Sequence, residues 1–271
     1  MLSPDQVPQG WGNIATVYER AFEKLTTQFS DEALHQLALR PGEKVLDVAT
    51  GTGAFSLAAA RQGGDVLATD FAEGMIARLQ QRIDSEGLEN IQAQVMNGQN
   101  LELDDDSHHV AASIVGVIFF PDIAKGFAEL KRVLKPKGRC AVVCWGDPDK
   151  FEMMIYLKRA IQIAAPGFEM PTQTPVWARL TGREQLEKEM NSAGFNNVRV
   201  TNMTGKLAMG FPLEFWNDFT SSAPPLAKLF EALGEEKTRE TGEVFARLVM
   251  TDCHDGLPCL TAEACIGIGE A

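Results

Sequence analysis

The sequence lacks several features that would assign the protein to a membrane, secreted or nucleic-acid-binding class. Within 271 residues, no apolar run approaches the roughly 20 residues that a membrane-spanning helix needs. The first residues have neither the basic start nor the apolar centre of a signal peptide. Lys and Arg number 25 against 37 Asp and Glu, and no basic cluster interrupts the net charge of −12. Because such a surface repels phosphate backbones, we expect a cytoplasmic protein with a small-molecule partner and no nucleic acid.

Cysteine is scarce and shows no ligand pattern. The five cysteines are an odd number without metal-ligand spacing, and Cys140 and Cys144 flank three apolar residues of an expected strand. The four histidines form no zinc pattern with neighbouring acids either. We predict no metal site, and we expect the cysteines to be small buried apolar side chains in a reducing compartment.

What the sequence does contain is a strand that runs directly into a glycine-rich turn, over residues 44–53. The apolar run Val45-Leu46 and Val48 is typical of a central parallel strand that is covered on both faces. Gly51 and Gly53 leave the backbone accessible, and a helix expected over 55–62 directs its unpaired N–H groups toward a ligand. This combination predicts a binding site for a nucleotide-like molecule.

Two common nucleotide motifs do not fit this turn. The P-loop pattern G-x-x-x-x-G-K-[ST] is absent from the chain. The dinucleotide pattern G-x-G-x-x-G is incomplete, because Ser56 stands where the third glycine belongs. That glycine leaves room for a pyrophosphate, so its absence argues against a nicotinamide cofactor.

Polar side chains also end the next two expected strands, 65–70 and 91–96. Asp70 is placed to accept hydrogen bonds from both hydroxyls of a ribose; its alternative role is to cap the helix expected over 73–86. Asn97 offers a donor and an acceptor to the edge of a purine base, although a plain turn also explains it.

Strands and helices alternate up to residue 145, which predicts an α/β fold with a parallel sheet. Further strands are expected at 110–117 and 139–145, with a helix capped by Asp122 between them and a turn at 136–138. Beyond Trp145 we expect helices at 151–164 and 182–192, a sixth strand beginning at 197–201, a helical stretch at 211–250 broken at Pro224-Pro225, and a last, antiparallel strand at 260–268. We interpret residues 1–271 as one domain with helical insertions at 147–180 and 211–250.

Residues 1–40 precede the first strand and are expected to be helical. Trp11, Tyr18 and Phe22 share one helical face, and a second helix is expected from Asp31 to Leu39. This segment is either a packed edge helix or a cap whose Trp11 and Tyr18 close over a bound small molecule.

Besides the glycine turn, Asp70 and the loop at Asn97, the chain contains Leu134-Lys135-Pro136-Lys137-Gly138 and Ala193-Gly194-Phe195 before two expected strands. Together, and in this order, these features resemble class I S-adenosylmethionine-dependent methyltransferases, especially the small-molecule enzymes of quinone and polyketide biosynthesis. Leu46-Asp47-Val48-Ala49-Thr50-Gly51-Thr52-Gly53 resembles the first motif, and Asp70 matches the family's ribose-binding acid. Asn97-Gly98-Gln99-Asn100-Leu101 resembles the adenine loop, where the first position is more commonly Asp. Leu134-Lys135-Pro136-Lys137-Gly138 and Ala193-Gly194-Phe195 resemble the turns before the fifth and sixth strands.

The resemblance implies a doubly wound, seven-stranded, mostly parallel sheet in the order 3-2-1-4-5-7-6, with the last strand antiparallel. It implies S-adenosylmethionine as cofactor and S-adenosylhomocysteine as product. The residues that it implies for cofactor binding are Tyr18, Asp47, Thr50, Gly51, Gly53, Asp70, Phe71, Met75, Asn97, Gly98, Gln99 and Val115, with Gly116 beside the last on the methyl-transfer face.

The expected reaction is in-line transfer of a methyl group to a small, apolar or aromatic acceptor. Because the sulfonium methyl is already electrophilic, positioning is the main task, and a base is needed only for a nucleophile that must lose a proton. No catalytic residue is assigned; Tyr18, His108 and His109 are the candidates for a base. Two alternatives stay open: a protein that binds S-adenosylmethionine without transferring its methyl, and an NAD-dependent dehydrogenase.

Overall fold

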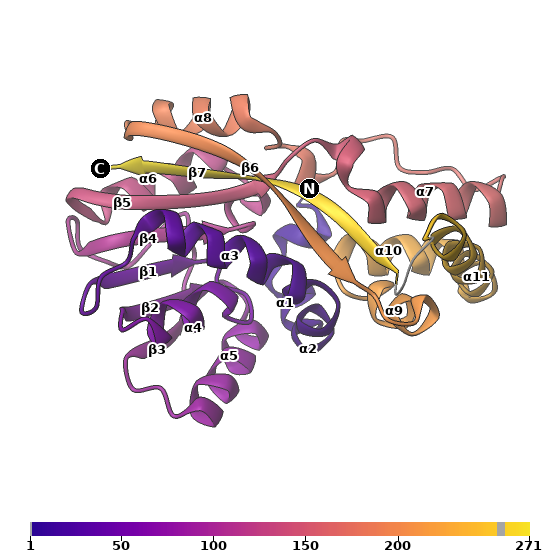
Figure 1. The fold of residues 1–271 in the computed structure, drawn as a ribbon, viewed down its shortest axis with the longest axis horizontal. Helices are drawn as coiled ribbons and strands as arrows, with labels where there is room; N and C mark the ends of the chain where they lie inside the picture. Colours follow the sequence, from indigo (N-terminus) through magenta and orange to yellow (C-terminus); the bar gives the residue numbers. More distant parts are fainter. Residues whose placement is uncertain (1, 254–257) are drawn as a thin grey trace.

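Short apolar segments with branched side chains form the centre of a seven-stranded sheet (Figure 1). The computed structural model describes residues 2–253 and 258–271. The strand order is β3-β2-β1-β4-β5-β7-β6; the first five of these strands are parallel, and β7 is antiparallel to both β5 and β6. The strands are β1 (Lys44–Val48), β2 (Asp65–Asp70), β3 (Ile91–Val95), β4 (His108–Ile114), β5 (Leu134–Trp145), β6 (Asn196–Ala208) and β7 (Cys259–Glu270). The fold class, the strand order and the antiparallel last strand are therefore confirmed.

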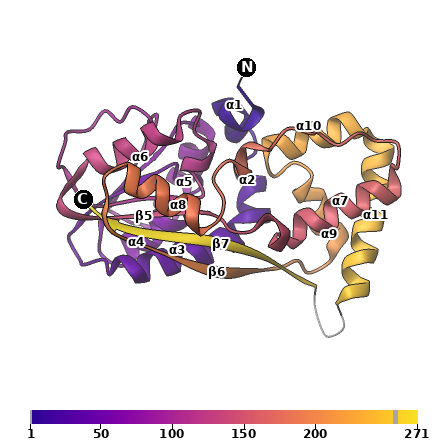
Figure 2. The ribbon, with the colours of Figure 1, turned by 90° about the horizontal axis from the view of Figure 1, so that it is seen from above.

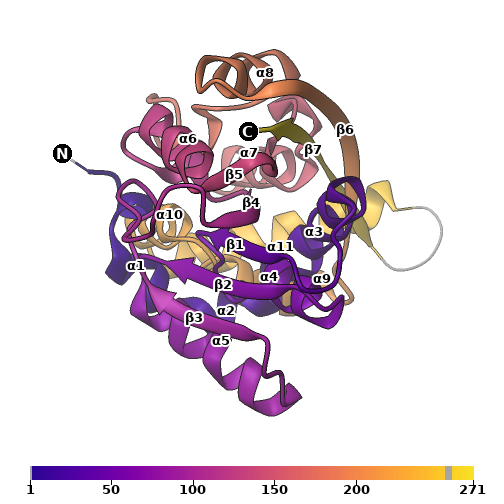
Figure 3. The ribbon, with the colours of Figure 1, turned by 90° about the vertical axis from the view of Figure 1, so that its left-hand side faces the viewer.

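Helices cover both faces of this sheet (Figure 3). One face carries α3 (Lys24–Leu37), α4 (Ala54–Arg61) and α5 (Glu73–Glu86), and the other carries α6 (Ile123–Arg132) and α8 (Arg183–Ser192). The predicted cap of α6 is present, because the Asp122 carboxylate accepts a hydrogen bond from the Lys125 backbone at 3.0 Å. The expected glycine stop of α5 is present too, since Gly87 has a left-handed φ of 64°.

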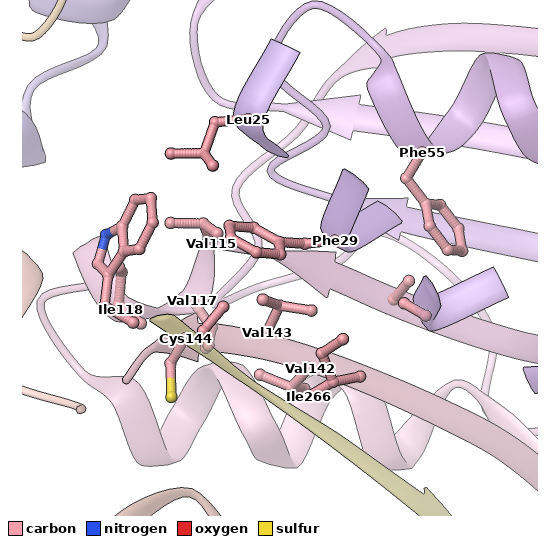
Figure 4. Packing of buried hydrophobic residues seen from close by; sticks show 14 of the residues in the cluster. Leu25, Phe29, Phe55, Val115, Val117, Ile118, Val142, Val143, Cys144 and Ile266 are labelled. Atoms are coloured by element: carbon pink, nitrogen blue, oxygen red, sulfur yellow. The ribbon is translucent and has the colours of Figure 1, made fainter. Parts of the chain in front are cut away.

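The core lies between α3 and the central strands (Figure 4). Leu25 and Phe29 of α3 lie on the side of Val143 of β5. Val142, the preceding residue, points to the opposite face of the sheet, and all four side chains are buried. Cys140, Cys144 and Cys265 are buried apolar residues, as expected, whereas Cys259 is exposed.

A helical lobe extends beyond the sheet, next to the far ends of β6 and β7 (Figures 1 and 2). It contains α7 (Glu152–Ala164), α9 (Pro212–Phe219), α10 (Pro224–Leu233) and α11 (Glu235–Asp252). Aromatic rings from three of these helices pack together at centroid distances from 5.1 to 6.5 Å: Trp216, Phe219, Phe230 and Phe245. No helix among the described residues is both long and apolar enough to cross a bilayer.

The N-terminal segment differs from the sequence expectation. It consists of η1 (Pro4–Gln6), α1 (Pro8–Gly12), α2 (Ala15–Tyr18) and a π-helical turn, η2 (Glu19–Glu23), and it continues without interruption into α3. The predicted helix start at Asp31 is wrong, because this residue lies inside α3. The buried stripe of Phe29, Ala33, Leu34 and Leu37 holds that helix on the sheet across the position of Asp31.

Helix α1 contacts both parts of the molecule through its two glycines. A Cβ on Gly12 would lie 3.3 Å from the Gly74 nitrogen at the start of α5, and a Cβ on Gly10 would lie 3.1 Å from Cγ of Pro224 at the start of α10. Figure 2 shows α1 between the sheet and the helical lobe.

Two further predictions are corrected at the ends of elements, and the sixth strand begins where it was predicted but extends further. Strand β5 begins at Leu134, five residues before the predicted start, and the expected turn at 136–138 is an irregular part of this strand, with a positive φ of 66° at Lys137. Strand β6 continues to Ala208 because β7 pairs with it along most of that length. Pro224 and Pro225 begin α10 rather than only breaking a helix. Proline is tolerated there because the N–H groups of the first helical turn have no partner within the helix.

The contact between β6 and α3 leaves no room for a side chain at Gly205. A Cβ there would lie 2.7 Å from Leu25 and from Phe29. Gly205→Val is therefore expected to lower the free energy of unfolding by about 2 kcal/mol, measured by urea denaturation. Gly167→Ala is the control, because nothing lies within 4 Å of its Cβ position. Equal stability of the two variants would contradict the packing argument.

Candidate functional site

The site is built where the carboxyl ends of β1, β2 and β4 meet. After β1 the chain turns through three residues in the left-handed region, Ala49 (φ 58°), Gly51 (φ 57°) and Gly53 (φ 95°), and then enters α4. The Thr50 N–H donates to the Thr69 carbonyl at 2.9 Å, so the turn is fixed to the end of β2. Gly53 has a packing role as well, since a Cβ there would lie 2.3 Å from Cδ1 of Leu79 in α5.

Asp47 lies directly below this turn and is only 1% exposed. Its Oδ2 accepts hydrogen bonds from the hydroxyls of Thr50 (2.7 Å) and Ser56 (2.6 Å). Its Oδ1 has no hydrogen-bond partner among the described residues. Burial raises the pKa of Asp47 to about 6, and the charge of Asp70 adds to the increase. A buried carboxylate oxygen without a partner indicates that a donor or a cation belongs beside it.

Asp70 joins the end of β2 to the same turn. Its Oδ2 accepts from the Gly51 N–H at 2.9 Å, and its Oδ1 accepts from the Ala72 N–H at 2.9 Å. Burial raises the pKa of Asp70 to about 6, against the lowering effect of these hydrogen bonds. Asp70 is not the cap of α5, because the residue that precedes this helix is Ala72. Each carboxylate oxygen keeps a second lone pair that a hydroxyl could use.

The N-terminal segment covers this turn. The Tyr18 ring is 3.7 Å from the position that a Cβ of Gly51 would occupy. Tyr18, Trp11 and Phe71 pack around the buried side chains of Ala72 and Met75. Burial raises the pKa of Tyr18 to about 12, helped by the nearby carboxylates, so its hydroxyl stays protonated at neutral pH. Tyr18, Phe71 and Met75 are thus brought together with the turn, but Tyr18 is a poor candidate for a base.

The loop Asn97-Gly98-Gln99 lies beside Phe120. Asn97 Oδ1 accepts from the Gln99 N–H at 3.0 Å, which is the geometry of the plain turn that was the alternative explanation. Gln99 Oε1 accepts from the Asp122 N–H at 2.8 Å, so this side-chain oxygen already has a protein partner. A Cβ on Gly98 would lie 2.5 Å from the Phe120 ring, so glycine is required there for packing.

The end of β4 is strained. Val115 has a φ of 55°, which is unfavourable for a β-branched residue, and its N–H donates to the Val143 carbonyl at 2.9 Å. The next residue, Gly116, faces Ala49: a Cβ on Gly116 would lie 2.6 Å from that of Ala49. The two neighbouring strands therefore turn away from the sheet in the same unusual conformation, at the edge where ligands bind in this type of sheet.

The two histidines that were candidates for a base lie at the amino-terminal ends of the strands, opposite to the glycine turn. His108 begins β4, and His109 Nδ1 accepts from the Lys44 N–H at 2.9 Å, at the start of β1. Burial lowers the pKa of His108 to about 4. Because the strands are parallel, their starting ends are remote from the glycine turn, so neither histidine is placed to act as a base there.

A cavity of about 410 Å³ opens beside the site, next to Phe71. Its wall contains Pro8, Gln9, Gly12, Asn13, Phe71, Glu73, Gly74 and Val95. The amides of Gln9 and Asn13 come from the N-terminal segment, which the sequence prediction did not connect with this side of the site.

Sequence reasoning missed two further residues of the turn. Ala49 occupies the first of three alternating positions, 49, 51 and 53, which share a left-handed conformation. Its spacing of two residues from Gly51 is the feature of the sequence that could have indicated this conformation. Ser56 was considered only as a missing glycine, whereas its hydroxyl is a hydrogen-bond donor to Asp47.

Comparison with known proteins gives consistent matches. A family model described as a methyltransferase domain matches residues 45–138. An uncharacterised protein of Mycobacterium tuberculosis is 41% identical over 115 residues, and the match covers 42% of this chain and 42% of that protein. The demethylmenaquinone methyltransferase of Staphylococcus aureus is 28% identical over 221 residues, which cover 75% of this chain and 90% of that enzyme.

Two solved structures have the same architecture. YcgJ of Bacillus subtilis has a TM-score of 0.57 at 15% identity, covering 89% of this chain and 97% of YcgJ. The [4+2]-cyclase SpnF has a TM-score of 0.58 at 16% identity, covering 90% of this chain and 80% of SpnF. At these identities the likeness concerns the fold.

The fold and the turn define a Rossmann-like protein with a nucleotide-type site at the carboxyl edge of its sheet. The methyltransferase-domain match over residues 45–138 agrees with the class I S-adenosylmethionine-dependent methyltransferases that the motifs resemble. The resemblance inferred from the motifs is confirmed.

Ala49 offers a test of the strain in the turn. Replacing it with glycine removes a left-handed alanine, so Ala49→Gly should raise the free energy of unfolding by about 1 kcal/mol. Ala58→Gly, in the interior of α4, should lower it by a similar amount. Thermal and urea denaturation of both variants would show whether the free energy of unfolding changes in opposite directions. A lower stability of Ala49→Gly would contradict the conclusion that Ala49 is strained.

Proposed function

We propose that this protein transfers a methyl group from S-adenosylmethionine to a small, apolar or aromatic acceptor. The observation that carries the proposal is the buried Asp47 Oδ1, which has no hydrogen-bond partner among the described residues, next to a turn fixed by Asp70. Such an oxygen suits an ammonium group, and the methionine part of this cofactor carries one. The methyltransferase-domain match over the same residues supports this choice of ligand.

The other parts of the cofactor fit the remaining features of the site. Asp70, at the end of β2, would accept hydrogen bonds from the ribose hydroxyls with its free lone pairs. Phe71 and Met75 would flank the adenine, and the Asn97-Gly98-Gln99 loop would meet its edge. Thr50, Gly51 and Gly53 would lie against the methionine and ribose parts, with Tyr18 above them. The cavity beside Phe71 and Val95 would lie next to the adenine in this orientation.

The cofactor supplies an electrophilic methyl group, so the protein must mainly hold, orient and shield the reactants. Val115 and Gly116 would line the face from which the acceptor approaches. The N-terminal segment would exclude water, because Trp11 packs against Phe119 of the turn after β4 at 5.1 Å. Tyr18 would contribute shape rather than proton transfer, since its pKa is about 12.

The acceptor would enter between the sheet edge and the helical lobe. Aromatic contacts follow this route: Phe22 of η2 lies 6.2 Å from Phe219 of α9, and Phe151 lies 5.8 Å from Trp177. We therefore propose that segments 147–180 and 211–250 act as a lid for an apolar or aromatic molecule. The likeness to a demethylmenaquinone methyltransferase agrees with an acceptor of this kind. The net charge of −12 also favours a small molecule over nucleic acid.

A second candidate function is binding of S-adenosylmethionine without methyl transfer. It is favoured by the likeness to SpnF, which is named as a cyclase although it has this fold. The lack of an assigned base is compatible with both candidates. Incubating the protein with a metabolite extract and cofactor labelled in its methyl group separates them. Label in an extract compound supports transfer, whereas proven binding without any labelled product supports the second candidate.

Asp70→Asn tests the ribose contact. The variant keeps one acceptor oxygen but loses the charge, so affinity for S-adenosylhomocysteine should fall at least tenfold in calorimetry. Asp84→Asn, on the exposed face of α5, is the matched control and should bind as the unaltered protein does. Unchanged binding by Asp70→Asn would remove the ribose assignment.

The two buried carboxyls also predict a pH dependence. Their pKa values of about 6 are higher than in the unfolded chain, so their contribution to stability is present at low pH and is lost as the pH rises through 6. Binding of an ammonium group needs the ionised carboxylate, so the affinity for the cofactor changes with pH in the opposite direction to the stability. From pH 7 to pH 5, cofactor affinity should fall about tenfold or more, while thermal stability without ligand gains from these groups. Asp47→Asn should flatten the binding profile; an unchanged profile would contradict the role of Asp47.

A further inference from the structure

Glu23 connects the N-terminal segment to the glycine turn. It ends the π-helical turn η2 and is 7% exposed. Its carboxylate accepts a hydrogen bond from the Thr52 hydroxyl. Arg82 of α5 donates to both of its oxygens, at 2.6 and 2.7 Å, so the charge of Glu23 is compensated inside the protein. Because Thr52 stands between Gly51 and Gly53, this carboxylate reaches the centre of the turn.

Thr52 is held through its backbone as well. Arg82 Nη1 donates to the Thr52 carbonyl at 2.9 Å, in addition to its contacts with Glu23. The residues on both sides are glycines with positive φ values, 57° and 95°, which have wide conformational freedom on their own. Thr52 is 1% exposed. The shape of the turn therefore depends on contacts from outside it, and Glu23 and Arg82 supply two of them.

A second ion pair joins the same two elements without reaching the turn. Glu19, one turn earlier in η2, pairs with Arg78, one turn earlier in α5. The spacing of four residues is the same on both helices, so the Glu19–Arg78 and Glu23–Arg82 pairs lie in parallel. Of these two pairs, Glu23–Arg82 is the one that contacts Thr52. The Glu19–Arg78 pair can therefore serve as a control, because it holds η2 on α5 without contacting the turn.

We infer that Glu23 is a positioning residue for the cofactor turn, and that docking of the N-terminal segment and cofactor binding are coupled through Thr52. The inference rests on the proposed function for the identity of the ligand. With Glu23 in place, Thr52 is fixed and the turn keeps Gly51 against Asp70. Without it, Arg82 loses the carboxylate to which it donates, and the turn must be ordered when the ligand binds, which lowers affinity.

The experiment compares Glu23→Gln with Glu19→Gln, which remove the same charge from the two ends of η2. Thr52→Val and the double variant Glu23→Gln/Thr52→Val complete the set. Calorimetry with S-adenosylhomocysteine should give affinities about tenfold lower for Glu23→Gln and for Thr52→Val, and a change below about twofold for Glu19→Gln. The double variant should be little worse than either single one, because both act on the same contact.

Hydrogen exchange of the ligand-free protein gives a readout that does not depend on the ligand. Glu23→Gln should increase exchange in residues 50–54, and Glu19→Gln should leave it unchanged, even where both variants lose similar thermal stability. Equal exchange in the two variants, equal losses of affinity or additive effects in the double variant would overturn the inference. A flat titration of the unaltered protein would instead reject the proposed cofactor, and the exchange comparison would then decide the role of Glu23 alone.

Discussion

The hydrogen bond from the Gly51 backbone to the Asp70 carboxylate is the contact on which the rest of the site depends. It joins the turn after β1 to the end of β2, and it does so inside the protein, where an unpaired carboxylate would be costly. The same turn contacts Asp47 through Thr50, and α4 begins at its last glycine. One short turn thus sets the direction of a helix, the spacing of two strands and the position of two buried acids.

The segments outside the central sheet are arranged around that turn. The N-terminal helices cover it from one side, with Tyr18 above Gly51. The helical lobe, with its aromatic cluster on α9, α10 and α11, extends the surface beyond β4. The long strands β6 and β7 lead from the sheet to this lobe. Segments far apart in the sequence therefore meet over one edge of the sheet, whereas the opposite edge, with His108 and His109, is occupied by contacts between strand starts and turns.

The sequence was most informative where one local pattern determined the structure. Strand β2 and helix α5 have the predicted bounds, because an apolar run, an acid and a terminal glycine act within a few neighbouring residues. Asp31 misled the prediction, because an acidic residue that can begin a helix is also tolerated on the exposed side of a longer one. In the candidate site, the motifs singled out Asp47, Gly51 and Asp70, which the structure places at one turn. Glu23 was not singled out, because its partners Thr52 and Arg82 are 29 and 59 residues away and no local pattern relates them.

The five-residue helix α1 has a consequence for how the sheet and the helical lobe are held apart. Its two glycines bring its backbone against α5 on one side and against α10 on the other, so it has no side chains at these points that could adjust to a change of distance. The distance between α5 and α10 is therefore fixed by backbone at this place, whereas the Arg20–Asp218 ion pair joins η2 to α9 through two long side chains. In mechanical terms α1 is a short spacer between the sheet and the helical lobe.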